Sequence, residues 1–167
     1  MIAYELPLVL VVLVPVVQAE SIRLCDLLTH TPAASVSGVL ALLCGIACMQ
    51  ANLTIVPFDM PEAETELTGG VFIEYSGPPL AMFKLTRAMM LFTMPLFLVV
   101  LFFGGVVSAA GWPWKLAGFG LWFLLVALTI VLRNTTPRVR TDQAVHFFWG
   151  PASGVALVAV ALALLGW

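Results

Sequence analysis

Five of the nine carboxylates of the chain lie in one short segment, residues 57–77, which contains no lysine or arginine. They are Asp59, Glu62, Glu64, Glu66 and Glu74. Neighbouring carboxylates raise one another's pKa, and burial raises it further, so some could exchange protons near neutral pH. The residue types therefore fit either a proton relay linked to ion movement or a solvated acidic loop paired with cations. A metal site is disfavoured because no second set of ligands accompanies the segment.

The cations that could pair with this segment follow it along the chain. Lys84 and Arg87 are three residues apart, which would place them on one face of a helix as counter-charges for the acidic loop. Arg138, Arg140 and Asp142 form a second charged cluster. The two arginines of this cluster could bind lipid phosphate, hold the acidic loop, or only set the orientation of the chain in a membrane.

Long apolar runs must position these charged residues. The 167 residues are 62% hydrophobic and only 10% charged, with a mean hydropathy of +1.08. A soluble domain of this size cannot bury so much apolar surface, so the sequence predicts an all-α integral membrane protein. The net charge of −2 gives no indication of a nucleic-acid partner. We expect one transmembrane domain of about five helices, at residues 2–17, 34–56, 80–107, 115–132 and 148–167, with the acidic loop at 57–79.

Polar residues and prolines within these runs carry further expectations. Gln50 and Asn52 lie in the second half of the second run, where polar groups in lipid need partners, so we expect this half to face protein. Pro15 is expected to kink or end the first helix, and Pro95 to kink the third. Glu5, at the mouth of the first helix, is either a proton carrier or an interfacial residue.

The distribution of lysine and arginine predicts the orientation. Five spans would place the N-terminus, the acidic loop and the connector before the last helix on one side, together with five of the seven basic residues. The positive-inside rule makes that side cytoplasmic. We therefore expect a multi-pass protein of the inner (cytoplasmic) membrane, with a large soluble partner on the cytoplasmic side and lipid around the helices.

Four motifs along the chain resemble a known family. They are AYELP at 3–7, PFDMPEAETEL at 57–67, IEYSG at 73–77 and TPRVRTDQ at 136–143. In this order they resemble the membrane subunit shared by respiratory complex I, where it is known as the H subunit or subunit 1, and the energy-converting membrane-bound NiFe hydrogenases. The motifs span most of the chain, and the acidic one is highly specific to that family.

The resemblance implies that the chain anchors hydrophilic redox subunits and passes the effect of electron transfer to antiporter-like membrane subunits. It implies a proton-relay or coupling role for Glu5, Asp59, Glu62, Glu64, Glu66 and Glu74. The charge partners or docking residues would be Lys84, Arg87, Arg138, Arg140 and Asp142. The chain has no cysteine set for a cluster and no paired histidines for haem, so iron–sulfur clusters and the NiFe centre would belong to partner subunits.

Two departures from the family pattern shape the functional expectation. The family subunit is nearly twice as long and the match begins at its middle, so a separate chain could supply the N-terminal helices, or this chain is a fragment or a reduced subunit. Complex I relatives usually carry a glutamate where this chain has Arg87. The pattern EYSGPPLAMFKLTRAMM, with Lys84, looks closer to the hydrogenase and formate hydrogenlyase branch.

We therefore expect the membrane-anchor and coupling subunit of such a hydrogenase or formate hydrogenlyase-type complex, linked to proton or sodium translocation. One alternative is the H subunit of NADH-quinone oxidoreductase, with a quinone near the acidic loop. The other is a non-catalytic scaffold whose charges only dock the hydrophilic subunits.

Overall fold

The computed structural model describes residues 3–58 and 75–166 of the chain, and this part contains helices and no strand. The finding confirms the all-α class. The elements follow one another as α1 (Glu5–Ala19), α2 (Leu24–Leu27), η1 (Pro32–Ala34), α3 (Val36–Asn52), α4 (Pro78–Phe102), α5 (Gly104–Ser108), α6 (Trp112–Thr135), α7 (Thr141–Phe147), η3 (Phe148–Ala152) and α8 (Ser153–Leu164). The acidic residues Asp59, Glu62, Glu64, Glu66 and Glu74 lie outside the described residues.

Local sequence signals explain where the helices begin. The Ser35 side chain accepts a hydrogen bond of 3.0 Å from the backbone N–H of Gly38 and so caps α3. Proline occupies the first positions of both α4 and α6, where its missing N–H costs nothing. Gly77 precedes α4 with a φ of 67°, a conformation open to glycine, and turns the chain into the helix.

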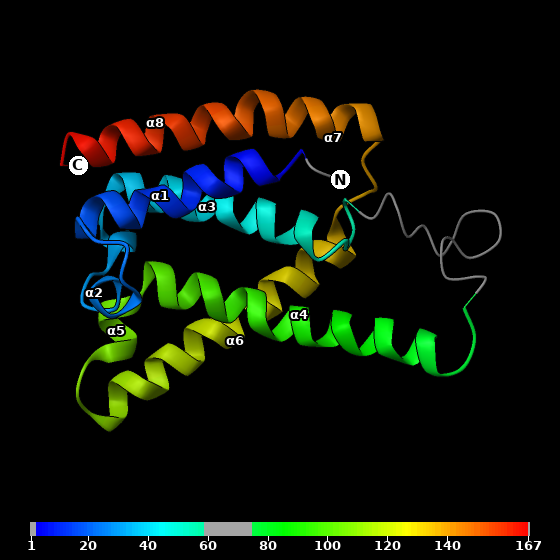
Figure 1. Cartoon of the computed structure of the whole chain (residues 1–167), viewed down its shortest axis with the longest axis horizontal. Helices are drawn as coiled ribbons and strands as arrows, with labels where there is room; N and C mark the ends of the chain where they lie inside the picture. Colours follow the sequence, from blue (N-terminus) through cyan, green and yellow to red (C-terminus); the bar gives the residue numbers. More distant parts are fainter. Residues whose placement is uncertain (1–2, 59–74, 167) are drawn as a thin grey trace.

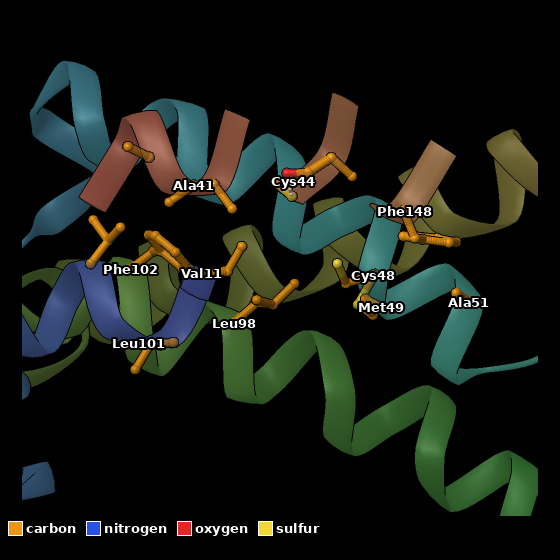
Figure 2. Close-up of a cluster of buried hydrophobic side chains, with 14 of the residues drawn as sticks. Val11, Ala41, Cys44, Cys48, Met49, Ala51, Leu98, Leu101, Phe102 and Phe148 are labelled. Carbon is orange, nitrogen blue, oxygen red and sulfur yellow. Dashed lines mark hydrogen bonds between the residues drawn. The ribbon is translucent and has the colours of Figure 1, made fainter. Parts of the chain in front are cut away.

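Helices α1, α3 and α8 pack against one another, and α4 and α6 form a second layer beside them (Figure 1). The contact between α1, α3 and α8 is built largely from small and medium-sized side chains. They include Val11, Ala41, Cys48, Ala156 and Ala159, all fully buried. Small residues allow helix backbones to approach closely, which is how helices associate in a membrane. Figure 2 shows Val11, Ala41 and Cys48 in one cluster with Leu98 and Phe102 of α4.

Helix α4 is buried at one end only. Its buried residues lie in its C-terminal third: Pro95, Leu98, Val99, Leu101 and Phe102. The residues of its N-terminal half are exposed or half-buried, and this half extends beyond α3 (Figure 1).

In the described part of the chain, three helices are long and apolar enough to cross a membrane: 78–102, 112–135 and 141–164. A fourth span arises if α1 and the segment 24–34, which meet at a bend of 77°, are counted together, and α3 is a shorter apolar helix. The protein is therefore a multi-pass membrane protein. The predicted number of five spans stays a prediction, because α1 and α3 have only 15 and 17 residues.

Several boundaries differ from those expected. The last helix begins at Thr141 and not at Phe148, so Asp142 and His146 lie in its first turns and not in a connector. An aspartate in the first turn stabilises the positive end of the helix dipole, which explains the early start. Pro15 lies inside α1 and does not end it.

The third apolar run is broken at Phe103, since α4 ends at Phe102 and α5 is a separate short helix. The two glycines that begin α5 explain the break. The backbone N–H of Gly105 donates to the carbonyl of His30 at 2.8 Å, and a Cβ on Gly104 would lie 2.6 Å from the carbonyl oxygen of Leu27. The glycines allow α5 to approach α2, the short helix between α1 and α3.

Candidate functional site

An aromatic cluster joins the beginning of the acidic loop to the N-terminal motif and to the start of the last helix. Phe58 is 7% exposed, and its ring lies 4.8 Å from that of Phe148 and 6.1 Å from that of Phe147. On the other side, Phe148 contacts Tyr4 with 6.5 Å between ring centroids, and the Tyr4 hydroxyl donates to Asn52 Oδ1 at 3.3 Å. The AYELP motif, Phe58 at the start of the acidic motif and the last helix therefore meet at one end of the bundle.

Glu5 lies at this end, as the first residue of α1 and directly after Tyr4. Its side chain is exposed. The first turn of a helix carries unsatisfied N–H groups and partial positive charge, which stabilise a carboxylate there. The structure thus brings Glu5 to the entrance of the acidic loop, in a position accessible from outside the bundle.

The basic turn before α7 is attached to the same entrance. The backbone N–H of Val139 donates to the carbonyl of Pro57 at 3.1 Å. Residues 136–140 carry no helical assignment, and Arg140 has an extended backbone, in which successive side chains point to opposite sides. Val139 packs against the core, whereas Arg138 and Arg140 are exposed. The alternation turns the two arginines outward on either side of Val139, whose backbone binds Pro57.

Asp142 follows this turn in the first turn of α7, and its side chain is exposed. The backbone N–H of Arg140 donates to Gln143 Oε1 at 3.4 Å, which closes the start of the helix. Asp142 and Arg140 therefore occupy the N-terminal end of α7, close to the hydrogen bond between Val139 and Pro57.

Tyr75, the first residue that the structure describes after Phe58, packs against α4. The ring of Tyr75 lies 5.3 Å from that of Phe83 in the second turn of the helix. Lys84 and Arg87 follow, and the structure gives them different environments. Lys84 is exposed, whereas Arg87 is half-buried and its Nε and Nη2 atoms are buried.

Arg87 reaches a pocket that the sequence did not indicate. The pocket has a volume of about 160 Å³, and its lining includes Arg87 and Arg133 as well as the turn that follows α3, residues 53–56. Thr54 in this turn has a φ of 49°. A β-branched residue in this left-handed conformation stores about 1–3 kcal/mol of strain. The sequence signal for Arg133 is its place near the end of an apolar run.

The polar residues in the second half of α3 face protein, as expected. Gln50 is 3% exposed, and its Nε2 donates to the carbonyl of Thr129 in α6 at 3.4 Å. Asn52 Nδ2 donates to Met94 Sδ at 3.6 Å. These contacts fix the end of α3, from which the acidic loop begins. Within residues 3–58 and 75–166, no group of three His, Cys, Asp or Glu residues is arranged to hold a metal ion.

Comparison with known proteins agrees with the motifs. The model of the NADH dehydrogenase family matches residues 1–164 of the chain. The chain belongs to this family. The H subunit of NADH-quinone oxidoreductase from Geobacillus thermodenitrificans is 38% identical over 167 residues, which cover 97% of this chain and 50% of that protein. The corresponding protein of Geobacillus kaustophilus is 37% identical with the same coverage.

The chain spans about half the length of these curated relatives and matches their C-terminal half. The predicted resemblance to the H subunit of complex I, limited to that half, is confirmed. Among solved structures, the membrane-bound sulfane sulfur reductase, an archaeal respiratory membrane complex, contains a similar chain with a TM-score of 0.84 and 21% identity. The match covers 97% of this chain and 56% of that one, and at this identity it shows the fold alone.

Proposed function

We propose that the chain is the membrane-anchor and coupling subunit of a complex I-like, redox-driven ion pump. The observation that carries the proposal is the meeting of three motif segments at one end of the bundle, through Tyr4, Phe58 and the hydrogen bond between Val139 and Pro57. A basic turn joined by its backbone to the entrance of an acidic loop responds to a change in charge near that entrance, because charges closer than a Debye length, about 8 Å at physiological ionic strength, still interact. This is the property that a coupling element requires.

In this proposal, hydrophilic redox subunits dock on the charged end of the bundle, and that end faces the cytoplasm from the inner membrane. The iron–sulfur clusters belong to those subunits, and electron transfer there changes the protonation of carboxylates in this chain. The responding carboxylates are Glu5, Asp59, Glu62, Glu64, Glu66 and Glu74. Charge compensation and docking are provided by Lys84, Arg87, Arg138, Arg140 and Asp142. Antiporter-like membrane subunits then move protons or sodium ions.

Neutral variants in the acidic motif test the coupling role. In purified complexes reconstituted into vesicles, Glu64→Gln or Glu66→Gln is expected to lower the ratio of ion uptake to redox turnover, while the subunit composition is unchanged. Glu20→Gln is the matched control, because Glu20 is an exposed carboxylate that follows the opposite end of α1. Normal pumping by both acidic-motif variants would exclude the relay role.

Two redox partners fit this role, and each rests on a different observation. Lys84 and Arg87 in α4 favour a hydrogenase or formate hydrogenlyase-type complex, with a NiFe centre in a partner subunit. The identities of 37–38% with the H subunits of NADH-quinone oxidoreductases favour a quinone reductase, with the quinone near the acidic loop. Metal and substrate analysis of the complex in mild detergent separates them: nickel with hydrogen evolution identifies the first, and quinone-dependent NADH oxidation without nickel the second. A separate chain with the N-terminal helices would appear in the same preparation.

The third possibility, a docking scaffold, makes a different prediction for Arg138. If its charge only docks the hydrophilic subunits, exchanging Arg138 with a carboxylate of the partner restores assembly and full coupled activity together. Restored assembly with uncoupled turnover supports the coupling role instead.

A further inference from the structure

A groove runs between the second half of α4 and the first half of α6, at the end of the bundle where α2 and α5 meet (Figure 1). It has a volume of about 260 Å³. All of its described lining residues except Lys115 are apolar. They include Leu96, Val99 and Val100 of α4, and Phe119 and Trp122 of α6. The groove therefore suits a guest that is mostly apolar and carries a negative charge at one end.

An aromatic cluster closes the inner end of the groove. Trp122 Nε1 donates to the carbonyl of Phe92 at 3.1 Å, and the two rings lie 4.8 Å apart. The ring of Phe119 lies 5.4 Å from that of Trp122. Because the indole N–H already has its acceptor, a guest that reaches this end meets apolar ring surface and needs no polar group there.

The other end of the groove lies at the membrane surface. Lys115 is exposed in the first turn of α6. Trp112 and Trp114, in the same turn, are 75% and 50% exposed. Tryptophan and lysine near the ends of membrane helices occupy the interface with the head groups. The groove thus leads from a cation at head-group level into the hydrocarbon region.

The dimensions of the groove distinguish an acyl chain from a protein helix. Lys115 and Trp122 are seven positions apart (122 − 115), about 10 Å along α6 at 1.5 Å per residue. Spread over this length, a volume of about 260 Å³ corresponds to a cross-section of about 25 Å². An α-helix about 10 Å in diameter needs about 80 Å². The groove is therefore too narrow to take a helix and admits a single extended chain.

We propose that this groove binds one acyl chain of an anionic phospholipid, whose phosphate pairs with Lys115. Leu96, Val99 and Val100 contact the acyl chain, and the burial of its methylene groups supplies most of the binding free energy. The ion pair with Lys115 selects the anionic head group. The site is separate from the proposed coupling function and does not depend on it.

Lipid titration followed by native mass spectrometry of the full chain in mild detergent tests the head-group contact. The probes are phosphatidylglycerol and the zwitterionic phosphatidylcholine. The wild-type chain is expected to bind phosphatidylglycerol about fivefold more tightly, the ratio that corresponds to one lysine beside an anionic membrane surface. Lys115→Gln should lose this preference. Arg23→Gln is the matched control, because Arg23 is an exposed cation directly before α2 and does not line the groove.

A second variant tests the acyl-chain contact in the same assay. Leu96→Trp fills part of the groove, and Leu96 is 41% exposed, so the replacement is tolerated. It should weaken the binding of both lipids, by about fourfold for each methylene group that it displaces. Leu85→Trp is the matched control, since Leu85 is a 61% exposed residue of the same helix outside the groove. If Leu96→Trp fails to fold, Leu96→Phe makes the same test with a smaller side chain.

Several results would overturn the proposal. Equal binding of the two lipids by the wild-type chain, or equal effects of Lys115→Gln and Arg23→Gln, would remove the head-group contact. Displacement of phosphatidylglycerol by millimolar inorganic phosphate would show that the anion binds without its acyl chain. Unchanged lipid binding by Leu96→Trp would exclude the acyl chain from the groove, and if this variant also lost subunits from the purified complex, the groove would belong to a partner's side chains.

Discussion

Phe58→Ala should detach the acidic loop from the bundle, at a cost that follows from the burial of the ring. Phe58 is 7% exposed and lies against Phe147 and Phe148. Replacing a buried phenylalanine with alanine costs about 3–5 kcal/mol, and we expect the lower value, about 3 kcal/mol, because the neighbouring rings can close part of the cavity. For a chain of this length each kcal/mol lowers the Tm by about 2–4 °C, so the expected decrease is about 6–12 °C.

The buried cysteines of the protein provide the assay. Cys48 is 0% and Cys44 is 6% exposed, whereas Cys25 is exposed. In a Cys25→Ser background, a thiol-reactive fluorophore therefore reports unfolding of the α1–α3–α8 core in detergent. Phe147→Ala is the matched control, since Phe147 also contacts Phe58 but is 40% exposed. Losing its two aromatic contacts, with Phe58 and with Phe148, is worth about 2 kcal/mol, which corresponds to about 4–8 °C.

The comparison of these two variants can refute the reasoning. Equal decreases in Tm would mean that Phe58 is not held by the cluster in the way that its burial indicates. A Phe58→Ala protein with unchanged Tm and unchanged coupling would remove the structural basis for treating the entrance of the acidic loop as a fixed point. A lowered coupling ratio at a temperature well below the Tm is the expected functional result.

Two further variants test the packing around the site with the same thiol assay. Gly104→Ala should destabilise the protein by about 1–3 kcal/mol, because the added Cβ would lie 2.6 Å from the carbonyl oxygen of Leu27. Gly120→Ala is the control and should be neutral or slightly stabilising, because no atom lies within 4 Å of its Cβ position. Equal effects of the two variants would contradict the close approach of α5 to α2. Gln50→Leu should lower the free energy of unfolding by about 1 kcal/mol, because the hydrogen bond to Thr129 is lost. Gln50→Glu should lower it by about 3 kcal/mol, because a charge is buried. A smaller effect of Gln50→Glu than of Gln50→Leu would show that Gln50 is hydrated.

The sequence was informative wherever one physical requirement dominated. Long apolar runs with few charges have to become helices in a membrane, so the start of α4 could be predicted to within two residues and both ends of α6 to within three. Gln50 and Asn52 were expected to contact protein because lipid offers them no hydrogen-bond partner, and the structure provides those contacts. The family followed from motifs, which encode residue identity and order and need no three-dimensional reasoning.

The sequence does not predict contacts between residues that are far apart in the chain. Phe58 belongs to the acidic motif, and nothing in the residues next to it in the sequence indicates that Phe148 lies against it. Arg133 and Arg87 are separated by 46 positions (133 − 87) and line one pocket only because α4 and α6 pack together. The predicted start of the last helix at residue 148 is seven residues too late, because the apolar run begins only there, whereas an aspartate such as Asp142 is also typical of a helical first turn.

The one-sided burial of α4 makes this helix a lever. Its fulcrum lies where Trp122 Nε1 donates to the Phe92 carbonyl at 3.1 Å and where Pro95 is buried, and Pro95 supplies no backbone hydrogen bond to stiffen the helix at that point. Lys84 lies eleven residues before Pro95, a lever arm of about 16 Å at 1.5 Å per residue. A tilt of about 5° then displaces the Lys84 end by about 1.4 Å on this arm, a distance that makes or breaks an ion pair. A tilt of the N-terminal half of α4 therefore also shifts its buried C-terminal part at Leu98 and Phe102, where α4 contacts α1 and α3.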